Sequence, residues 1–286
     1  MPAAIPKLRL RGVSKSFLAR GAITPTPAVA DFSLDLAAGE FVCIVGPSGC
    51  GKSTVLNMVA GLDTPDTGTI ELDGRTVTGP GAERGVMFQD YALMPWQTVA
   101  QNVAFGLRYG TPGQGLSAEQ VKQRVAQHLD LVGLTPAAAK YPHQLSGGMR
   151  QRVALARLLA NGPDVLLMDE PLGALDAQTR LILQVELLRI WGETRPLAQR
   201  KTAVFITHDI DEAVFLGDRV VVMSSHPGRV KADIAIDLPR PRREVLRGTP
   251  RFAEHTERIW GLIRDEAQRA IGGTDSINFH NEETSV

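Results

Sequence analysis

The sequence has only two cysteines, Cys43 and Cys50, and no excess of either charge. Both cysteines lie in or next to one apolar stretch, so we expect the reduced thiols of a cytoplasmic protein and not a disulfide framework. Lysine plus arginine equals aspartate plus glutamate, at 31 each, so no overall basic field would hold the chain on nucleic acid.

Long apolar runs and repeats are also missing. No run approaches the roughly 18 apolar residues that a membrane-spanning helix needs, and the N-terminus, MPAAIPKLRLRG, lacks the apolar stretch of a signal peptide. We therefore expect a soluble, cytoplasmic chain. Its 286 residues are 43% hydrophobic and 22% charged, which is ordinary for a globular protein of one large or two modest domains.

The order of apolar stretches predicts an α/β core. Residues 21–28, GAITPTPA, are typical of a surface loop, and DFSLDL, a turn at 38–39 and a buried strand at 41–45 follow. A glycine-rich loop and a helical pattern come next, which is how a parallel α/β unit begins. Later strands are predicted in DVLLMDEP, in TAVFITH and up to Met223.

Two further regions differ from this core. Around residues 91–141 the pattern is helical, with a Gly/Pro-rich break at 111–115, which indicates a helical subdomain inserted into the core. After His226, HPGRVKADIAIDLP suggests a further hairpin-like pair of strands, and residues 251–270 one helix. The last fifteen residues are polar, and we expect them to be frayed.

The glycine-rich loop matches the phosphate-binding pattern G-x-x-x-x-G-K-[ST]. Its residues are Gly46, Pro47, Ser48, Gly49, Cys50, Gly51, Lys52, Ser53 and Thr54. The backbone N–H groups of such a loop surround phosphate oxygens, and the following helix adds its dipole. Lys52 would reach the β- and γ-phosphates and the Ser53 hydroxyl would bind Mg²⁺. The alternative is a chance glycine-rich turn.

An acidic pair ends the predicted strand VLLMDE. Asp169 lies at the carboxyl edge of the sheet, where ligands of open α/β sheets bind, and would hold Mg²⁺ through water. Glu170 points elsewhere, which suits a base that orients the attacking water. The alternative is an acidic pair that caps a helix.

Two more polar residues end strands of the same predicted sheet. Gln89, in VMFQDY, could sense the γ-phosphate and bind Mg²⁺ with its amide, and His208, in VFITHD, could hydrogen-bond the γ-phosphate. Either one alone is more often a surface residue.

A second anion-binding pattern, LSGGMRQ, precedes a strongly helical run. Ser146, Gly147 and Gly148 would form a helix N-terminus able to hold a phosphate, but they belong to the inserted subdomain and not to the core. One nucleotide is not readily enclosed by both within one chain. A two-fold dimer solves this, because each such helix would then cover the nucleotide of the other subunit. The alternative is a serine cap with glycines that permit a tight turn.

Together these motifs resemble those of the ATP-binding cassette (ABC) transporter ATPases over roughly residues 8–240. GPSGCGKST resembles their Walker A motif, VLLMDE Walker B, LSGGMRQ the signature, Gln89 the Q-loop, Asp176 the D-loop aspartate and His208 the switch histidine. The resemblance implies a homodimer that encloses two ATP molecules with Mg²⁺, in which Ser146 and Gly148 touch the partner's γ-phosphate. It also implies that Phe17 stacks on adenine, with a plain core phenylalanine as the alternative.

Finer resemblance concerns the transport system. QDYALMPWQTVAQNVAFGL and HDIDEAVFLGDRVVVMSSHPGRV resemble the importer ATPases for nitrate, sulfonate, taurine and similar small solutes. This implies a peripheral protein on the cytoplasmic face of the inner membrane, with two permease subunits, an extracytoplasmic solute-binding protein and no nucleic acid as partners. Tyr91, Leu93, Met94 and Trp96 would either form the permease docking surface or pack inside the helical subdomain.

The expected fold is a P-loop NTPase core with a mixed sheet, an antiparallel β subdomain and an inserted α-helical subdomain. We expect the ATP-binding core in residues 1–90 and 162–240, the helical signature subdomain in 91–161, and a helical extension with a flexible tail in 241–286. The expected function is an ATPase that powers an importer. An exporter or lipid-handling complex is the alternative, followed by a non-transport ABC protein.

Overall fold

The computed structural model describes residues 5–18, 21, 23–109 and 115–272, and its centre is a six-stranded sheet in the order β10-β9-β3-β8-β7-β6. The strands are β3 (Phe41–Val45), β6 (Arg84–Met87), β7 (Val165–Asp169), β8 (Thr202–Ile206), β9 (Arg219–Met223) and β10 (Val230–Ala235). All neighbours are parallel except β9 and β10. The continuous apolar sequences of β3, β7 and β8 suit strands that are covered on both faces.

A second, antiparallel sheet has the order β2-β1-β4-β5. Its strands are β1 (Leu8–Phe17), β2 (Thr26–Leu36), β4 (Thr67–Leu72) and β5 (Arg75–Thr76). The predicted surface loop at 21–28 was therefore too long, since β2 begins at Thr26. Thr26 pairs with Phe17 and Pro27 with Ser16, and a proline is tolerated there because β2 is an edge strand.

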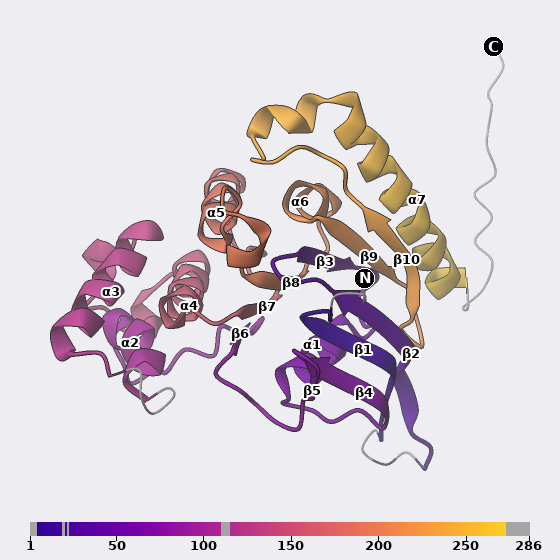
Figure 1. Cartoon of the computed structure of the whole chain (residues 1–286), viewed down its shortest axis with the longest axis horizontal. Coiled ribbons are helices and arrows are strands. Elements are labelled where there is room, and N and C mark those ends of the chain that lie inside the picture. Colours follow the sequence, from indigo (N-terminus) through magenta and orange to yellow (C-terminus); the bar gives the residue numbers. More distant parts are fainter. Residues whose placement is uncertain (1–4, 19–20, 22, 110–114, 273–286) are drawn as a thin grey trace.

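Alternate residues of the central strands face two different cores. Val42 and Ile44 of β3 pack with α1 (Lys52–Ala60) and the antiparallel sheet. Phe41 and Cys43 face the other side, with α5 (Ala177–Trp191) and α6 (Ile210–Leu216). Figure 1 shows α1 and the antiparallel sheet on one side of the central strands and α5 and α6 on the other. Both cysteines are buried free thiols, as expected without a disulfide framework.

The helical region lies beside β6, at one edge of the central sheet (Figure 1). It contains α2 (Val99–Tyr109), α3 (Ala118–Leu131), α4 (Gly147–Asn161) and two short 3₁₀ helices, Thr135–Ala137 and Pro142–Gln144. These helices share a core of their own, but α4 also places Leu155 and Leu158 in the core beneath the sheet. The predicted domain boundaries stay a prediction, since α4 belongs to both cores.

The C-terminal segment follows β10 with a short 3₁₀ helix, Glu244–Gly248, and the long helix α7 (Pro250–Gly272). The single helix predicted for 251–270 is confirmed. The hairpin-like pair predicted after His226 is wrong, because only β10 forms there and its partner is the preceding strand β9. The predicted tail lies in residues outside the described ones.

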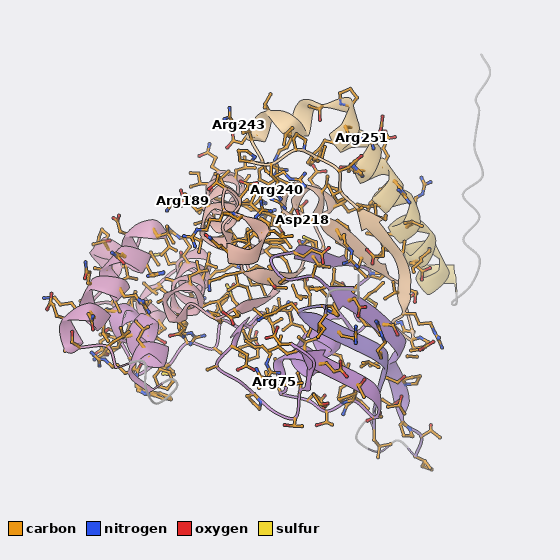
Figure 2. The ribbon with its side chains drawn as sticks, viewed as in Figure 1. Arg75, Arg189, Asp218, Arg240, Arg243 and Arg251 are labelled. Atoms are coloured by element: carbon orange, nitrogen blue, oxygen red, sulfur yellow. The ribbon has the colours of Figure 1, made fainter. Side chains whose placement is uncertain are left out.

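Ion pairs fasten this segment to the core. Arg240 donates to Asp218 at 2.8 Å and to Glu193 at 3.0 Å, and Figure 2 shows Arg240 and Asp218 close together. The Arg240 guanidinium also lies 4.5 Å from the ring centroid of buried Trp191. None of the described helices combines the length and apolarity that crossing a lipid bilayer requires. The predicted mixed sheet, antiparallel sheet and helical region are all confirmed.

Candidate active site

The glycine-rich loop connects the carboxyl end of β3 to the first turn of α1. Gly51 has φ +92°, and a Cβ atom there would lie 2.8 Å from the Ala28 carbonyl oxygen, so only glycine fits. The Lys52 ammonium donates hydrogen bonds of 2.8 Å to the carbonyls of both Gly46 and Pro47. These bonds hold the cation against the loop, where it can meet the charge of a bound phosphate.

Ser53 and Asp169 lie together beside this loop. They line one cavity of about 390 Å³ with Gln89, Asn57, Phe88, Asp90 and Ala92. Burial raises the pKa of Asp169, while a hydrogen bond with the Ser53 hydroxyl lowers it, the neighbouring Glu170 charge raises it and Lys52 lowers it. A hydroxyl, a carboxylate and an amide at one cavity are the oxygen donors that Mg²⁺ prefers, so the donor set fits that ion.

Glu170 occupies a strained backbone position directly after β7. Its φ is +47°, a left-handed conformation that is uncommon outside glycine, and its N–H donates to the Ile206 carbonyl at 3.0 Å. The Glu170 carboxylate lies 3.4 Å from Nδ1 of His208, which follows the adjacent strand β8. The structure thus brings two predicted side chains from neighbouring strand ends into contact at the sheet edge.

The predicted second anion-binding motif forms the N-terminus of α4. The Ser146 hydroxyl caps the helix by accepting a 3.2 Å hydrogen bond from the Met149 N–H. A Cβ atom on Gly148 would lie 3.4 Å from the Ala174 carbonyl and 3.2 Å from a Leu175 methyl group. A Cβ atom on Gly147 would meet no described atom within 4 Å, so packing within the chain does not account for glycine there.

Comparison with known proteins decides the family. A profile of the ABC transporter family matches residues 29–173. The chain belongs to the ABC transporter family. It is an ATPase of that family, and its hydrolysis of ATP is coupled to transport.

Two similar proteins are named as importer subunits. The chain is 48% identical over 252 residues to the nitrate import ATP-binding protein NrtD of Synechococcus elongatus, which covers 85% of this chain and 89% of that protein. It is 46% identical over 277 residues to the taurine import ATP-binding protein TauB of Jannaschia sp., covering 94% and 98%.

Solved structures agree in fold. The dimeric ABC transporter cassette MJ0796 superposes with a TM-score of 0.73 at 33% identity, covering 81% of this chain and all of that one. A dimeric post-hydrolysis structure of the same cassette, bound to ADP and phosphate, gives a TM-score of 0.72 at 32% identity with the same coverage. The predicted ABC ATPase fold is therefore confirmed.

The two remaining predicted ABC residues lie at the end of β1 and at the start of α5. Asp176 caps α5, and the hydrogen bond that its carboxylate accepts from the Thr179 N–H, 2.9 Å long, lowers its pKa. Phe17 ends β1, is 45% exposed and has the Lys15 ammonium 5.6 Å from its ring centroid. The core alternative for Phe17 is therefore wrong, while stacking on adenine stays a prediction.

The stretch after Gln89 contains both packed and solvent-exposed apolar side chains. Tyr91 and Leu93 pack partly buried against the cores, whereas Trp96 is 74% exposed. Tyr91 and Ala92 have positive φ, and Arg157 of α4 donates to the carbonyls of both, at 2.7 and 2.6 Å. A role for Arg157 could not be predicted, because nothing in its local sequence indicates partners more than 60 residues away.

Gln151 is a second residue that the sequence left without a role. Its amide nitrogen donates to the Glu170 carbonyl at 3.1 Å, and its amide oxygen accepts from the Ala174 N–H at 3.2 Å. The signature helix is thereby tied to the Walker B and D-loop segments. The sequence signal that could have indicated this role is a glutamine within LSGGMRQ on the buried face of the predicted helix.

Proposed function

We propose that this chain is the ATP-hydrolysing subunit of an importer for nitrate, a sulfonate, taurine or a similar small solute. The observation that carries this proposal is the similarity to two named import subunits along 85% and 94% of the chain. In the proposed complex, two copies of the chain lie at the cytoplasmic face of the inner membrane. They bind two permease subunits and act with an extracytoplasmic solute-binding protein.

The core supplies one half of each proposed ATP site. The loop amides from Gly46 to Thr54 would hold the phosphates, and Lys52 would neutralise their charge. Ser53, Gln89 and Asp169 would hold Mg²⁺, which when bound neutralises charge that develops on the phosphate oxygens.

Glu170 and His208 would carry out the catalytic step in this half. Glu170 would accept a hydrogen bond from the attacking water and orient it in line with the γ-phosphate. His208 would hydrogen-bond the γ-phosphate, and the 3.4 Å contact with Glu170 supports a shared position at the phosphate. Backbone strain at Glu170 is a further sign of a functional position.

The signature helix of the partner copy would supply the other half. The open space beside Gly147 and the exposed Ser146 cap support a phosphate contact from outside the chain. The dimeric form of the similar MJ0796 cassette supports the same arrangement. Asp176 would contact the shared nucleotide near the dimer interface, and Phe17 would stack on its adenine.

The surface after Gln89 is the proposed permease contact. Trp96 presents a large aromatic side chain to solvent, and such residues are enriched where proteins associate. Arg157 fixes the backbone between Gln89 and this surface by its bonds to Tyr91 and Ala92. Movement of a docked permease helix would therefore reach Gln89 through a short, rigid segment.

The test is transport by the assembled complex in liposomes. The ATPase, its permeases and its binding protein are reconstituted with ATP on the ATPase side, and labelled nitrate, taurine and an alkanesulfonate are supplied on the other side. We expect solute-loaded binding protein to stimulate ATP hydrolysis and one labelled solute to accumulate on the ATPase side. Export of the labelled solute from the ATPase side would contradict the proposal, and so would a rate of ATP hydrolysis that the binding protein does not change.

A further inference from the structure

We infer that Arg247, in the C-terminal segment, is a positioning residue for the switch histidine His208. The inference rests on the role in ATP hydrolysis that is proposed above for His208. The connection between them is a line of three buried polar side chains, Gln184, Glu212 and Thr207.

Hydrogen bonds link each member of this line to the next. Arg247 Nη2 donates to Gln184 Oε1 at 2.5 Å. Gln184 Nε2 donates to Glu212 Oε1 at 2.9 Å, and the Thr207 hydroxyl donates to Glu212 Oε2 at 2.5 Å. Thr207 directly precedes His208 in the chain, so the line ends at the backbone that carries the histidine.

Burial makes the loss of any of these hydrogen bonds costly in free energy. Gln184 and Thr207 are 2% exposed and Glu212 is 4% exposed, so water does not readily replace a lost partner. Arginine can only donate, so Gln184 must turn its amide oxygen to Arg247 and its amide nitrogen to Glu212. Arg247 and Glu212 thus fix the orientation of Gln184 from its two sides.

Arg247 is itself held firmly. Its guanidinium lies 4.3 Å from the ring centroid of Phe215 on α6 and 5.8 Å from that of Phe252 on α7. Burial lowers the pKa of Arg247, and nearby carboxylates led by Asp211 oppose that shift. Its position therefore depends on the docking of the C-terminal segment onto α6.

The backbone on the other side of His208 joins the same network. The Asp209 N–H donates to the Thr207 hydroxyl at 3.0 Å, and the Asp209 carboxylate caps α6 by accepting from the Glu212 N–H at 3.0 Å. The His208 side chain is 66% exposed, with Glu170 at 3.4 Å. Because so little encloses the ring, its place at the phosphate depends on the held backbone of residues 207–209.

Removal of Arg247 should lower the rate of ATP hydrolysis without weakening ATP binding. Without Arg247, the buried Gln184 amide oxygen loses its hydrogen-bond donor, one of the two groups that orient the amide, and the restraint on Thr207 through Glu212 weakens. Misplacement of a catalytic group by about 1 Å can cost up to ~100-fold in rate. The phosphate loop is untouched, so ATP binding should stay near its wild-type strength while turnover falls.

The experiment compares two arginines of the same segment. Arg247→Met removes the first member of the network. Arg251→Met instead removes an exposed guanidinium on α7, labelled in Figure 2, which pairs with Asp237. We expect Arg247→Met to lower kcat for ATP by about 10-fold with KM changed less than about 2-fold. We expect Arg251→Met to match wild type in both constants and Arg247→Lys to recover part of the lost kcat.

A double-mutant cycle tests the line itself. Gln184→Met should lower kcat as Arg247→Met does, and the double variant should be no slower than the worse single variant, because one network is broken in each case. Fully multiplicative losses would overturn the inference. Gln184→Met also carries the test if Arg247→Met fails to fold.

A His208→Ala arm separates this inference from the proposed site. Hydrolysis at the wild-type rate in His208→Ala would contradict the proposed role of His208 and remove the basis of the inference. A slow His208→Ala enzyme together with wild-type kcat in Arg247→Met would overturn the inference alone.

Discussion

The phosphate-loop region and the signature region have different relations to the rest of the chain. At the phosphate loop, Lys52, Asp169 and Glu170 all make contacts with groups of their own chain. At the signature, Gly147 faces open space and Ser146 is an exposed helix cap. The difference supports the proposal that the chain supplies one half of an ATP site at the phosphate loop, while its signature residues are left accessible to another copy.

A direct link nevertheless joins the two regions. Gln151 of the signature helix holds the Glu170 carbonyl and the Ala174 N–H. A phosphate that binds at the N-terminus of α4 would therefore act on the same rigid unit as the residue proposed to orient water. In the proposed dimer, this link would offer a physical route by which the nucleotide on one subunit affects catalysis on the other.

The largest expected effect is at Glu170. Glu170→Gln keeps the shape of the side chain but removes its basicity, so hydrolysis should fall by about 10²–10⁴-fold while ATP still binds. The bound ATP should then hold two copies together, measurable as a dimer by light scattering. Glu257→Gln, at an exposed position on α7, is the matched control and should hydrolyse ATP normally. A Glu170→Gln protein that stays monomeric when saturated with ATP would count against a shared site.

The next effect is at Lys52, and Lys201 offers a comparison. Both ammonium groups donate to two backbone carbonyls, Lys52 to Gly46 and Pro47 and Lys201 to Gly162 and Pro163. Only Lys52 lies in the phosphate loop. Lys52→Met should weaken ATP binding by about 10–100-fold, because hydrogen bonds to a charged group contribute ~1.5–3 kcal/mol. The dissociation constant is measured by calorimetry. Equal weakening by Lys201→Met would mean that the effect is structural.

The smallest expected effect tests the link between the regions. Gln151→Met leaves the Glu170 carbonyl and the Ala174 N–H without their buried partner, at a cost of about 1–3 kcal/mol. The melting temperature should fall by roughly 2–4 °C per kcal/mol, and turnover should fall with it. Gln123→Met, exposed on α3, should change neither quantity. Unchanged stability and turnover in Gln151→Met would show that the link is unimportant.

Local sequence signals were enough to predict much of the site. The phosphate loop, the acidic pair that ends VLLMDE and the histidine that ends VFITH each follow a continuous apolar strand. Parallel strands end at one edge, so the contact between Glu170 and His208 follows from topology. The strand after His226 was misassigned because a short apolar stretch does not reveal its partner, which is the earlier strand β9.

Residues that act across long separations could not be predicted. Gln151, Arg157 and Arg247 each bind a carbonyl or side chain on another element, and their own surroundings in the sequence carry no motif for that contact. The C-terminal segment was likewise without a predicted role. Only packing of α7 and the preceding turn against α6 brings Arg247 to the network behind His208.

One measurement tests most directly whether each ATP site is shared by two copies. Heterodimers are purified through two affinity tags in two arrangements. In the first, Ser146→Arg is in one chain and Glu170→Gln in the other; in the second, both changes are in one chain and its partner is wild type. A shared site leaves one intact ATP site in the first arrangement and none in the second, so only the first should hydrolyse ATP. Hydrolysis by the second arrangement and none by the first would show that each chain forms its own complete site.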